Sequence, residues 1–575
     1  MQKNKYIVFL RWLFINDSIG SDIMKKNPFL QGAMIATIGI IITKILGIIY
    51  VIPFYAIIGV QGGALYGYAY SIYSIFLKLS SIGIPLAMSK LISEYNTLEY
   101  FDIKERAFLI GKKFVLLLSV ISFFILIFFA PLLAHIFIGD IQGGNTIEDV
   151  TFVIRVVASA ILIVPILSVT RGYLQGHRFI TPSSISQVLE QIVRVIIIVV
   201  GSYLCMVVFD LSLKFTIGLA VFGATLGAFI SYLYLIIKMG KNKNELNREN
   251  ESSKILHKIS EKDILIKLLS YSAPFIFSSL ILSFYHFVDL STIVKTMVRG
   301  LNYDIVEAET TISILLVWGL KLNMIIMAIA TGLTTSLLPN IISSYVADNL
   351  TDLRYKINRS IQILLFVTLP MAVGLSLLAG PVWTLFYGYN QLGTLVFKYS
   401  IMISIFTSLL IILNIILQSL NQFKKMFTFI LTGFVIKLLF NIPLMYSFSS
   451  IGFHASYGVI TASIIGYFIS IGLILRFLKK SIGVNYEDTF NKIINIFFTV
   501  VIMSVVILLI QFVVPVDTAN RLHALGLIIF YSIIGASIYI YITIKNKLLF
   551  EIVGKSFIER ILTKMKINNF INYDL

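Results

Sequence analysis

The chain has 575 residues, of which 58% are hydrophobic and only 13% are charged, and its mean hydropathy is +0.92. Soluble domains carry about 25% charged residues, so this composition excludes an ordinary soluble enzyme and predicts a polytopic membrane protein. The formal net charge of +18 does not indicate nucleic-acid binding, because the basic residues lie mainly in short loops between apolar runs. The single cysteine, Cys205, excludes an intrachain disulfide and a cysteine-cluster metal site.

The first 23 residues differ from the rest of the chain. Residues 1–23 contain an apolar patch that is too short and too polar to span a bilayer, and no small-residue cleavage site follows it. We expect a dispensable N-terminal extension, with Met24 as a natural beginning for the first span. The alternative is a short interfacial helix anchored by Arg11 and Trp12.

Apolar runs long enough to cross a membrane recur along the remaining chain. They predict an all-α protein with fourteen transmembrane helices, near 29–58, 62–93, 113–138, 149–173, 181–209, 214–238, 264–295, 308–345, 359–386, 392–420, 425–448, 452–478, 490–514 and 523–545.

Loop charge gives an independent test of this count, because Lys and Arg gather in cytoplasmic loops. Basic clusters follow every second predicted span, and the longest such loop follows the sixth. The loop at 139–145 has neither Lys nor Arg, and only Lys214, Lys295, Arg299 and Arg521 break the rule. The pattern predicts a multi-pass membrane protein with both termini in the cytoplasm.

The loops leave little room for enzymatic chemistry. None exceeds about thirty residues, and the sequence contains no GxxxxGK[ST] phosphate loop, no HExxH and no paired-carboxylate motif on an exposed segment. We therefore expect no enzymatic activity, no cofactor, no metal and no ATP-driven transport within this chain.

Short matches between the two halves predict an internal repeat. Residues 91–95 resemble 341–345, residues 174–178 resemble 420–424, and residues 227–231 resemble 466–470, at offsets of 250, 246 and 239. Each pair lies six helices apart with the same polarity, which favours two parallel six-helix lobes around a central cavity.

The predicted domains follow from the spans and this repeat. They are an extension (1–23), an N-lobe with six helices (24–238), a basic cytoplasmic linker (239–263), a C-lobe with six helices (264–480), the last two helices with their linker (481–545), and a cytoplasmic tail (546–575).

Charged residues inside the predicted spans are candidate functional residues, since they are costly in a bilayer. Six are cations, Lys44, Lys78, Arg155, Arg194, Lys321 and Lys437, and two are acids, Glu190 and Asp289. Cations in such excess would make a shared cavity electropositive and suited to an anionic substrate. The alternative for each is a structural or snorkelling role.

Three of these charges have a specific alternative. Glu190 and Arg194 stand four residues apart on one helix and can pair directly. Asp289 could neutralise Lys295 or bind a coupling cation, either H⁺ or Na⁺.

Helix breakers lie in the same spans. Pro85, two residues after Gly83, removes a backbone hydrogen bond from the second span and favours a bend. Pro53, Pro274 and Pro339 are placed similarly in other spans, and the alternative to a mechanical role is ordinary packing.

Two segments carry a resemblance to a known family. Residues 83–95, beginning Gly83-Ile84-Pro85 and ending at Tyr95, resemble the G-[IL]-P-x-A-x-S-K…E segment of polysaccharide-type transporters. These transporters belong to the multidrug/oligosaccharidyl-lipid/polysaccharide (MOP) exporter superfamily. Residues 43–47 resemble the [ST]-[RK]-x-L-G segment of its peptidoglycan-precursor branch, and the resemblance is closest to stage V sporulation protein B-like lipid II flippases.

The resemblance implies a flippase that moves an undecaprenyl-pyrophosphate-linked glycan, most simply lipid II, by alternating access through a cationic cavity. In the family, basic residues of helices 1, 2 and 8 engage the pyrophosphate, and Lys44, Lys78 and Lys321 occupy comparable places. Helices 13 and 14 would form a groove for the lipid tail. Some members carry a second basic residue in helix 1, but this chain lacks it and has Tyr50 near that place. Another lipid-linked glycan therefore remains open as the substrate.

Two other functions remain as alternatives. A multidrug/cation antiporter of the same superfamily predicts interior acids for cationic drugs, whereas this chain has excess interior base. A membrane glycosyltransferase or polymerase would need a catalytic cluster on a sizeable outer loop. For the flippase we expect a monomer in the lipid bilayer, without nucleic acid, driven by the membrane potential or by a coupling cation.

Overall fold

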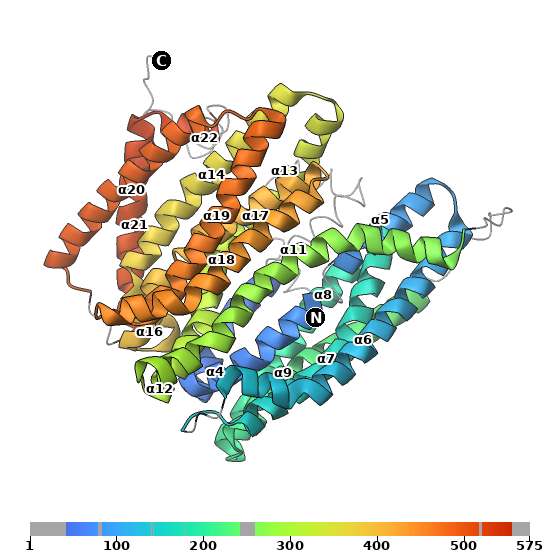
Figure 1. The fold of residues 1–575 in the computed structure, drawn as a ribbon, viewed down its shortest axis with the longest axis horizontal. Helices are drawn as coiled ribbons and strands as arrows, with labels where there is room; N and C mark the ends of the chain where they lie inside the picture. Colours follow the sequence, from blue (N-terminus) through green and yellow to red (C-terminus); the bar gives the residue numbers. More distant parts are fainter. Residues whose placement is uncertain are drawn as a thin grey trace, which may run out of the picture. The chain divides into compact units, whose positions relative to one another are not determined.

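The computed structural model describes residues 39, 42–78, 83–139, 141, 143–177, 179–241, 259–516 and 520–554. Within these ranges the ordered elements are helices, as the all-α prediction required (Figure 1). The predicted extension 1–23 lies outside the described residues, as do most of the predicted linker 239–263 and most of the predicted tail 546–575.

The helices of the first part of the chain begin with a short helix at Ile42–Ile49. They continue as α4 (Val51–Leu77), α5 (Gly83–Thr97), α6 (Phe101–Ile138), α7 (Ile147–Gly176), α8 (Ile180–Ile196) with the π-helical turns η2 (Ile197–Gly201) and η3 (Leu204–Val208), and α9 (Leu213–Lys241).

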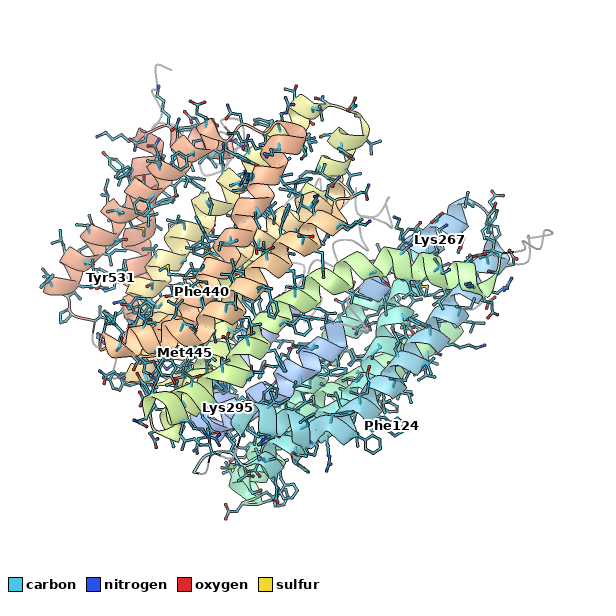
Figure 2. The ribbon with its side chains drawn as sticks, in the orientation of Figure 1. Phe124, Lys267, Lys295, Phe440, Met445 and Tyr531 are labelled. Atoms are coloured by element: carbon cyan, nitrogen blue, oxygen red, sulfur yellow. The ribbon has the colours of Figure 1, made fainter. Side chains whose placement is uncertain are left out.

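The second part of the chain begins at α11 and contains the longer series of helices. They are α11 (Glu261–Lys295), η5 (Thr296–Gly300), α12 (Ile305–Ser313), η6 (Ile314–Trp318), α13 (Gly319–Val346), α14 (Leu350–Leu377), α15 (Ala379–Tyr387), α16 (Gln391–Ser400), α17 (Ile403–Ser419), α18 (Phe423–Ser450), α19 (Ser456–Ile482), α20 (Glu487–Val513), α21 (Arg521–Lys545) and α22 (Leu548–Val553). Figure 2 labels Lys267 near one end of α11 and Lys295 near the other.

Among the described residues, eleven helices are long and apolar enough to cross a membrane. The number becomes twelve if Ile42–Ile49 and Val51–Leu77 are taken as one bent span. The predicted count of fourteen is therefore not confirmed. The predicted break between the first two spans does coincide with Gly59, whose φ of 64° and ψ of −163° interrupt α4.

One predicted boundary was wrong by about three turns. Lys104, Arg106 and Lys112 precede the predicted span 113–138, but α6 begins at Phe101 and carries all three. Asp102 lies in the first turn of this helix, where a carboxylate favours the helix dipole. Hydropathy marks the apolar part of a helix and does not register a polar extension that continues the same hydrogen bonding.

Side-chain caps explain several helix starts. The Asp304 carboxylate accepts a hydrogen bond from the backbone N–H of Val306 at the start of α12. Asn390 and Asn520 cap α16 and α21 in the same way. Thr146 and Asp149 bond each other reciprocally before α7, as in a capping box.

Apolar side chains remain exposed along the outer faces of several spans. Phe124 and Phe128 on α6 are 50% and 71% exposed, and Phe512 on α20 is 89% exposed. A soluble protein would bury such residues, whereas a bilayer solvates them. Their backbone groups are satisfied within the helices, as lipid requires.

The described chain divides into two compact units. The first comprises Met1–Tyr50, Phe76–Phe129 and Phe152–Ile276. Within it α9 packs closely on α8, since a Cβ at Gly227 would lie 2.7 Å from the Glu190 carbonyl oxygen. Ser231, four residues after Gly227, donates to the Ser186 carbonyl oxygen at 3.0 Å.

The second unit comprises Val51–Ile75, Ala130–Thr151 and Phe277–Leu575. Its core contains buried aliphatic residues of α13, α14, α17, α18 and α19. Here α19 packs closely on α18, since a Cβ at Gly433 would lie 2.2 Å from the Gly466 carbonyl oxygen. Ser470, four residues after Gly466, donates to the Phe429 carbonyl oxygen at 3.0 Å.

Candidate functional site

Three helical side chains of the first unit form a compact ion cluster. The Glu190 carboxylate on α8 forms salt bridges with Arg194 of the same helix at 2.5 Å and with Arg171 of α7 at 2.9 Å. The Arg171 Nε also donates to the Ser186 hydroxyl at 2.8 Å. The expected Glu190–Arg194 pair is confirmed, but the cluster holds two cations for one carboxylate and so keeps a net positive charge.

Lys437 on α18 lies in a buried polar network of the second unit. Its ammonium is 2.6 Å from Asp289 of α11, 2.7 Å from the Ser463 hydroxyl of α19 and 3.2 Å from the Asn441 amide oxygen. The Lys437 side chain is fully buried. Three acceptors match the three protons of a lysine ammonium, so the charge is both neutralised and fully hydrogen-bonded.

This network gives Asp289 a partner that the sequence did not indicate. The carboxylate pairs with Lys437 rather than remaining open for Lys295. Asn441 extends the network by donating to the Thr292 hydroxyl at 2.7 Å. The network therefore ties α11, α18 and α19 together within the second unit.

The remaining cations of the first unit occupy different surroundings. Lys44 is exposed on the helix Ile42–Ile49, and Lys78 is half-buried at the end of α4. Arg155 is exposed on α7 and donates through Nε to the Ile127 carbonyl oxygen at 3.2 Å. That backbone contact gives Arg155 a structural partner on α6.

Lys321 belongs to the second unit and lies beside aromatic side chains. Its ammonium is 5.8 Å from the centre of the Tyr70 ring, within cation–π range. Tyr70 in turn stacks on Tyr66, with ring centres 5.6 Å apart. Lys321 follows the π-helical turn η6, a helix irregularity that often marks functional positions.

Trp318, three residues before Lys321, is fully buried among rings of the same unit. Its ring centre lies 5.1 Å from that of Tyr55 and 5.6 Å from that of Tyr387. Gly63 provides the space, because a Cβ there would approach the Trp318 Nε1 to 2.3 Å. The aromatic surroundings fix the start of α13 and hence the position of Lys321.

The predicted bend near Gly83 and Pro85 stays a prediction. The described part of α5 begins at Gly83, directly after residues that the structure does not describe. Gly172 of α7 packs against Pro85, since a Cβ at Gly172 would lie 2.5 Å from the Pro85 carbonyl oxygen. Residues 79–82, where a bend would be seen, lie outside the described residues.

Sequence reasoning missed two charged residues. Arg171 lies near the end of the predicted span 149–173 and was not among the candidate residues, but α7 continues to Gly176 and brings Arg171 to Glu190. Glu309 lies at the edge of the predicted span 308–345, yet its side chain is fully buried in the second unit. An i, i+4 search could not find either, because their partners come from other segments of the chain.

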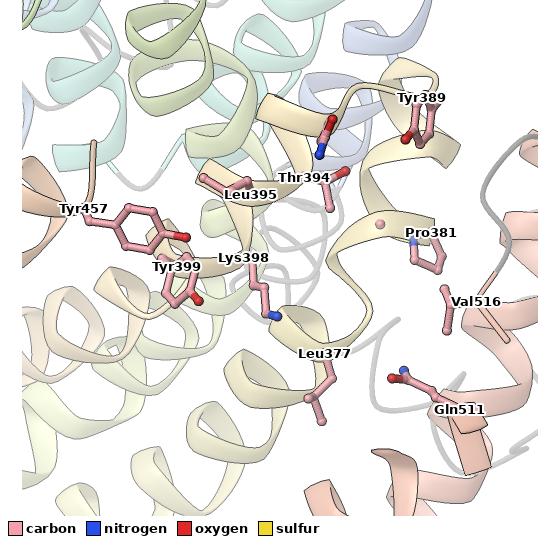
Figure 3. Close-up of a pocket in the computed structure, with 12 residues that line it drawn as sticks. Leu377, Pro381, Tyr389, Thr394, Leu395, Lys398, Tyr399, Tyr457, Gln511 and Val516 are labelled. Carbon is pink, nitrogen blue, oxygen red and sulfur yellow. The ribbon is translucent and has the colours of Figure 1, made fainter. Parts of the chain in front are cut away.

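Figure 3 shows a pocket of about 400 Å³ in the second unit that the sequence did not reveal. Its polar lining includes Lys398 and Tyr399 of α16, Tyr457 of α19 and Gln511 of α20. The Gln511 Nε2 is buried without a hydrogen-bond partner. A lysine and an unsatisfied amide donor make the pocket suitable for a small anionic or carbonyl-bearing group.

Comparison with known proteins gives a family match and three curated relatives, two of which are described here. Residues 29–300 match the family described as "Polysaccharide biosynthesis protein". The chain is 32% identical over 538 residues to "Lipid II flippase MurJ" of Bacillus subtilis (strain 168), covering 92% of this chain and 97% of the relative. It is 27% identical over 252 residues to "Stage V sporulation protein B" of the same organism, covering 44% and 46%.

Two solved structures share the fold. "Lipid II flippase MurJ, inward closed conformation" aligns with a TM-score of 0.60 and 18% identity, over 90% of this chain and all of that chain. A multidrug resistance MATE family transporter of the MOP superfamily, in an inward-facing conformation, aligns with a TM-score of 0.59 and 14% identity, over 78% and 98%. At these identities the structures show the fold alone, and the resemblance to MOP polysaccharide transporters is confirmed.

Proposed function

This chain belongs to the family of the lipid II flippase MurJ, and we propose that it moves the peptidoglycan precursor lipid II across the bacterial cytoplasmic membrane. The observation that carries the proposal is similarity along nearly the whole of both chains, rather than within one shared module. The many apolar helices agree with a multi-pass membrane transporter. The MurJ relative is a flippase and the MATE neighbour is a transporter, which agrees with the expectation that the chain is not an enzyme.

We further propose fourteen spans arranged as two six-helix lobes, with boundaries 24–238 and 264–480 and two additional helices in 481–545. Left-handed backbone positions support the repeat. Gly59, Glu99, Gly139 and Asp210 have positive φ, and so do their counterparts Asn302, Asp348, Gly388 and Gly452, each 242 to 249 residues later. The equivalent glycine–carbonyl and serine–carbonyl contacts of α8–α9 and α18–α19 support it independently.

For the substrate contacts we propose Lys44, Lys78 and Lys321, which would bind the pyrophosphate of undecaprenyl-pyrophosphate-linked lipid II. A lysine is a compact point charge that suits phosphate oxygens. Desolvation inside a transporter strengthens such contacts relative to water. We assign Arg194 and Lys437 to positioning roles, because each already pairs with a carboxylate.

The transport cycle proposed here is alternating access. The headgroup would enter a cationic cavity while the polyprenyl tail remains in lipid beside the last two spans, α20 and α21. We propose cytoplasmic termini and a monomeric transporter, supported by the positive-inside pattern of the loops. The membrane potential or a coupling cation would supply the energy.

A flippase for another lipid-linked glycan is the alternative that shares this machinery. A multidrug antiporter is disfavoured, because a cationic drug would meet the interior excess of Lys and Arg. The MATE-like fold does not favour it, since fold similarity at 14% identity carries no substrate information.

The test is a flipping assay in proteoliposomes with fluorescent lipid II, read by quenching of the lipid exposed on the outer surface. About half of the fluorescent lipid II faces outward before any flipping and is quenched in all vesicles. When the protein is present, we expect more than this half to be quenched, and in Lys44→Ala we expect the additional quenching to be lost. Arg155→Ala is the matched control, since Arg155 is also an exposed cation but bonds a backbone carbonyl.

A cellular test complements this assay. Depletion of the protein, in cells without a redundant flippase, should lower the lipid II exposed on the outer surface. Unchanged exposure in those cells, together with no flipping in proteoliposomes, would overturn the lipid II assignment. Flipping of a different undecaprenyl-linked glycan in the same vesicles would support the alternative substrate.

A further inference from the structure

Glu309 is a buried acid that the proposed substrate contacts do not use. It lies on α12, and its side chain has no exposed surface. The Oε1 atom accepts a hydrogen bond from the Asn145 backbone N–H at 2.9 Å. The Oε2 atom is buried and has no hydrogen-bond partner.

Among the described residues, the groups around Glu309 bring no compensating cation. Tyr68 of α4 and Asp149 of α7 are the titratable groups within its electrostatic reach in the described part of the chain. The Tyr68 hydroxyl is itself buried without a partner. An ionised carboxylate with one free oxygen in such surroundings would be costly, so the neutral carboxylic acid is the form that fits this conformation.

Glu309 also holds three turns of the second unit together. The carboxyl group packs against Gly144, where any Cβ would lie 2.8 Å from it. Asn145 follows and donates through Nδ2 to the Gln61 carbonyl oxygen, at 3.4 Å. The segment around Gly144 and the start of α12 therefore meet at the Glu309 carboxyl group, and the Asn145 side chain links this contact to the turn after Gly59. Loop charge predicts that all three lie on the outer side of the membrane.

We propose that Glu309 is a proton-binding site whose protonation holds these three outer turns together. When the turns separate, water reaches the carboxyl group, the O–H bond breaks and the proton passes to that water. For the turns to close again, the carboxylate must take up a proton from the outer solution. This inference deepens the proposed function and rests on it for one consequence, which is that the outer pH sets how readily the empty transporter closes on its outer side. The proton is taken up from the outer solution and released to it, so no net proton crosses the membrane.

The first experiment needs no lipid II. In a Cys205→Ser background, Ile305→Cys reports the contact, because the Ile305 side chain is 8% exposed and lies against Gly143. Val306→Cys, at a residue that is 43% exposed, corrects for the effect of pH on thiol reactivity. Right-side-out vesicles are labelled with an impermeant maleimide between about pH 5.5 and about pH 8.5, a range that covers buried carboxyl groups.

We expect normalised labelling of Ile305→Cys to rise several-fold as the outer pH rises. In Glu309→Gln, which stays neutral and keeps the acceptor for Asn145, labelling should remain low and flat. The matched control Glu307→Gln, two residues away on the same helix, should retain the rise. Equal rises with and without Glu309→Gln, or no rise in the parent, would overturn the proposal.

A second experiment tests whether protonation of Glu309 affects flipping. In proteoliposomes with fluorescent lipid II, flipping by the parent and by Glu307→Gln should slow as the pH on the outer side of the protein rises, whereas flipping by Glu309→Gln should not depend on that pH. Size-exclusion profiles check that the variants fold, and Glu309→Asp should restore pH-dependent labelling in part. Failure of flipping with pH-dependent labelling intact would reject the proposed function alone, whereas flipping with flat labelling would reject the proton site alone.

Discussion

The ammonium of Lys437 lies 2.6 Å from Asp289 Oδ1, and the Lys437 side chain is fully buried in the second unit. Its position inside a predicted span groups Lys437 with the cations that would meet an anionic substrate. A lysine whose three protons are taken by Asp289, Ser463 and Asn441 has little capacity left for a phosphate. The structure thus separates interior cations that support the fold from those with access to a ligand.

Breaking the Lys437–Asp289 pair is expected to destabilise the protein. Lys437→Met leaves a buried carboxylate without its cation, and loss of one partner of a buried pair costs about 3–5 kcal/mol. The double variant Lys437→Met/Asp289→Asn removes both charges and should recover part of the loss. Thermal unfolding in detergent measures both, and a Lys437→Met protein as stable as the parent would contradict the prediction.

Lys44→Ala is expected to lower transport without lowering the stability of the protein. Lys44 is exposed on its helix, so its removal should leave unfolding unchanged within about 0.5 kcal/mol. Flipping should fall by about tenfold or more if desolvated phosphate contact contributes over about 1.4 kcal/mol. A transport assay at matched protein levels measures the effect. Normal flipping by Lys44→Ala would contradict the proposed phosphate contact and favour the snorkelling alternative for Lys44.

The positions of Arg194 and Lys437 explain why sequence alone could not assign the interior cations. They lie on α8 and α18, helices that pack in the same manner against α9 and α19. Arg194 has its carboxylate four residues earlier on the same helix, which spacing predicts. Lys437 has its carboxylate on α11, 148 residues away in the chain, which no local pattern reveals.

The fold was more predictable than the site for a similar reason. Hydropathy and loop charge report each helix separately, so the helical class and most span positions followed from the sequence. Packing brings distant residues together, and the contacts of Arg171 with Glu190 and of Glu309 with Asn145 can be seen only in the folded structure. The polar start of α6 was missed because helical hydrogen bonding continues beyond the apolar segment.

The contact of Glu94 with Lys267 gives a pH-dependent prediction. Burial raises the pKa of the Glu94 carboxyl, but hydrogen bonds from Lys267 and Tyr271 outweigh it and hold the pKa below its ordinary value. A lowered carboxyl pKa adds stability above the unfolded value of 4.5, and this stability is lost as the pH falls through the folded value. Glu94→Gln should therefore unfold at a lower temperature than the parent at neutral pH.

The difference in unfolding temperature between Glu94→Gln and the parent should narrow as the pH falls below 4.5. Thermal unfolding across that range measures it, with Glu99→Gln as the control, because Glu99 lies at the exposed turn after α5. A constant difference between Glu94→Gln and the parent at all pH values would show that the hydrogen bonds do not depend on the charge of Glu94.

The close approach of α18 and α19 predicts that Gly433 cannot be enlarged. A Cβ at this position would lie 2.2 Å from the Gly466 carbonyl oxygen and 2.1 Å from the Ser470 hydroxyl. Backbone cannot move aside as a flexible side chain can, so Gly433→Ala should destabilise the protein by about 1–3 kcal/mol through overpacking. It should also lower the amount of folded protein in the membrane.

Gly472→Ala provides the matched control on α19, because nothing lies within 4 Å of the Cβ it would add. Alanine is a better helix former than glycine, so this variant should be neutral or slightly stabilising. Unfolding midpoints of the two variants, measured in the same detergent, separate packing from propensity. If Gly433→Ala were as stable as Gly472→Ala, α18 and α19 would have to lie further apart than the structure places them, and the Ser470–Phe429 bond would then be lost as well.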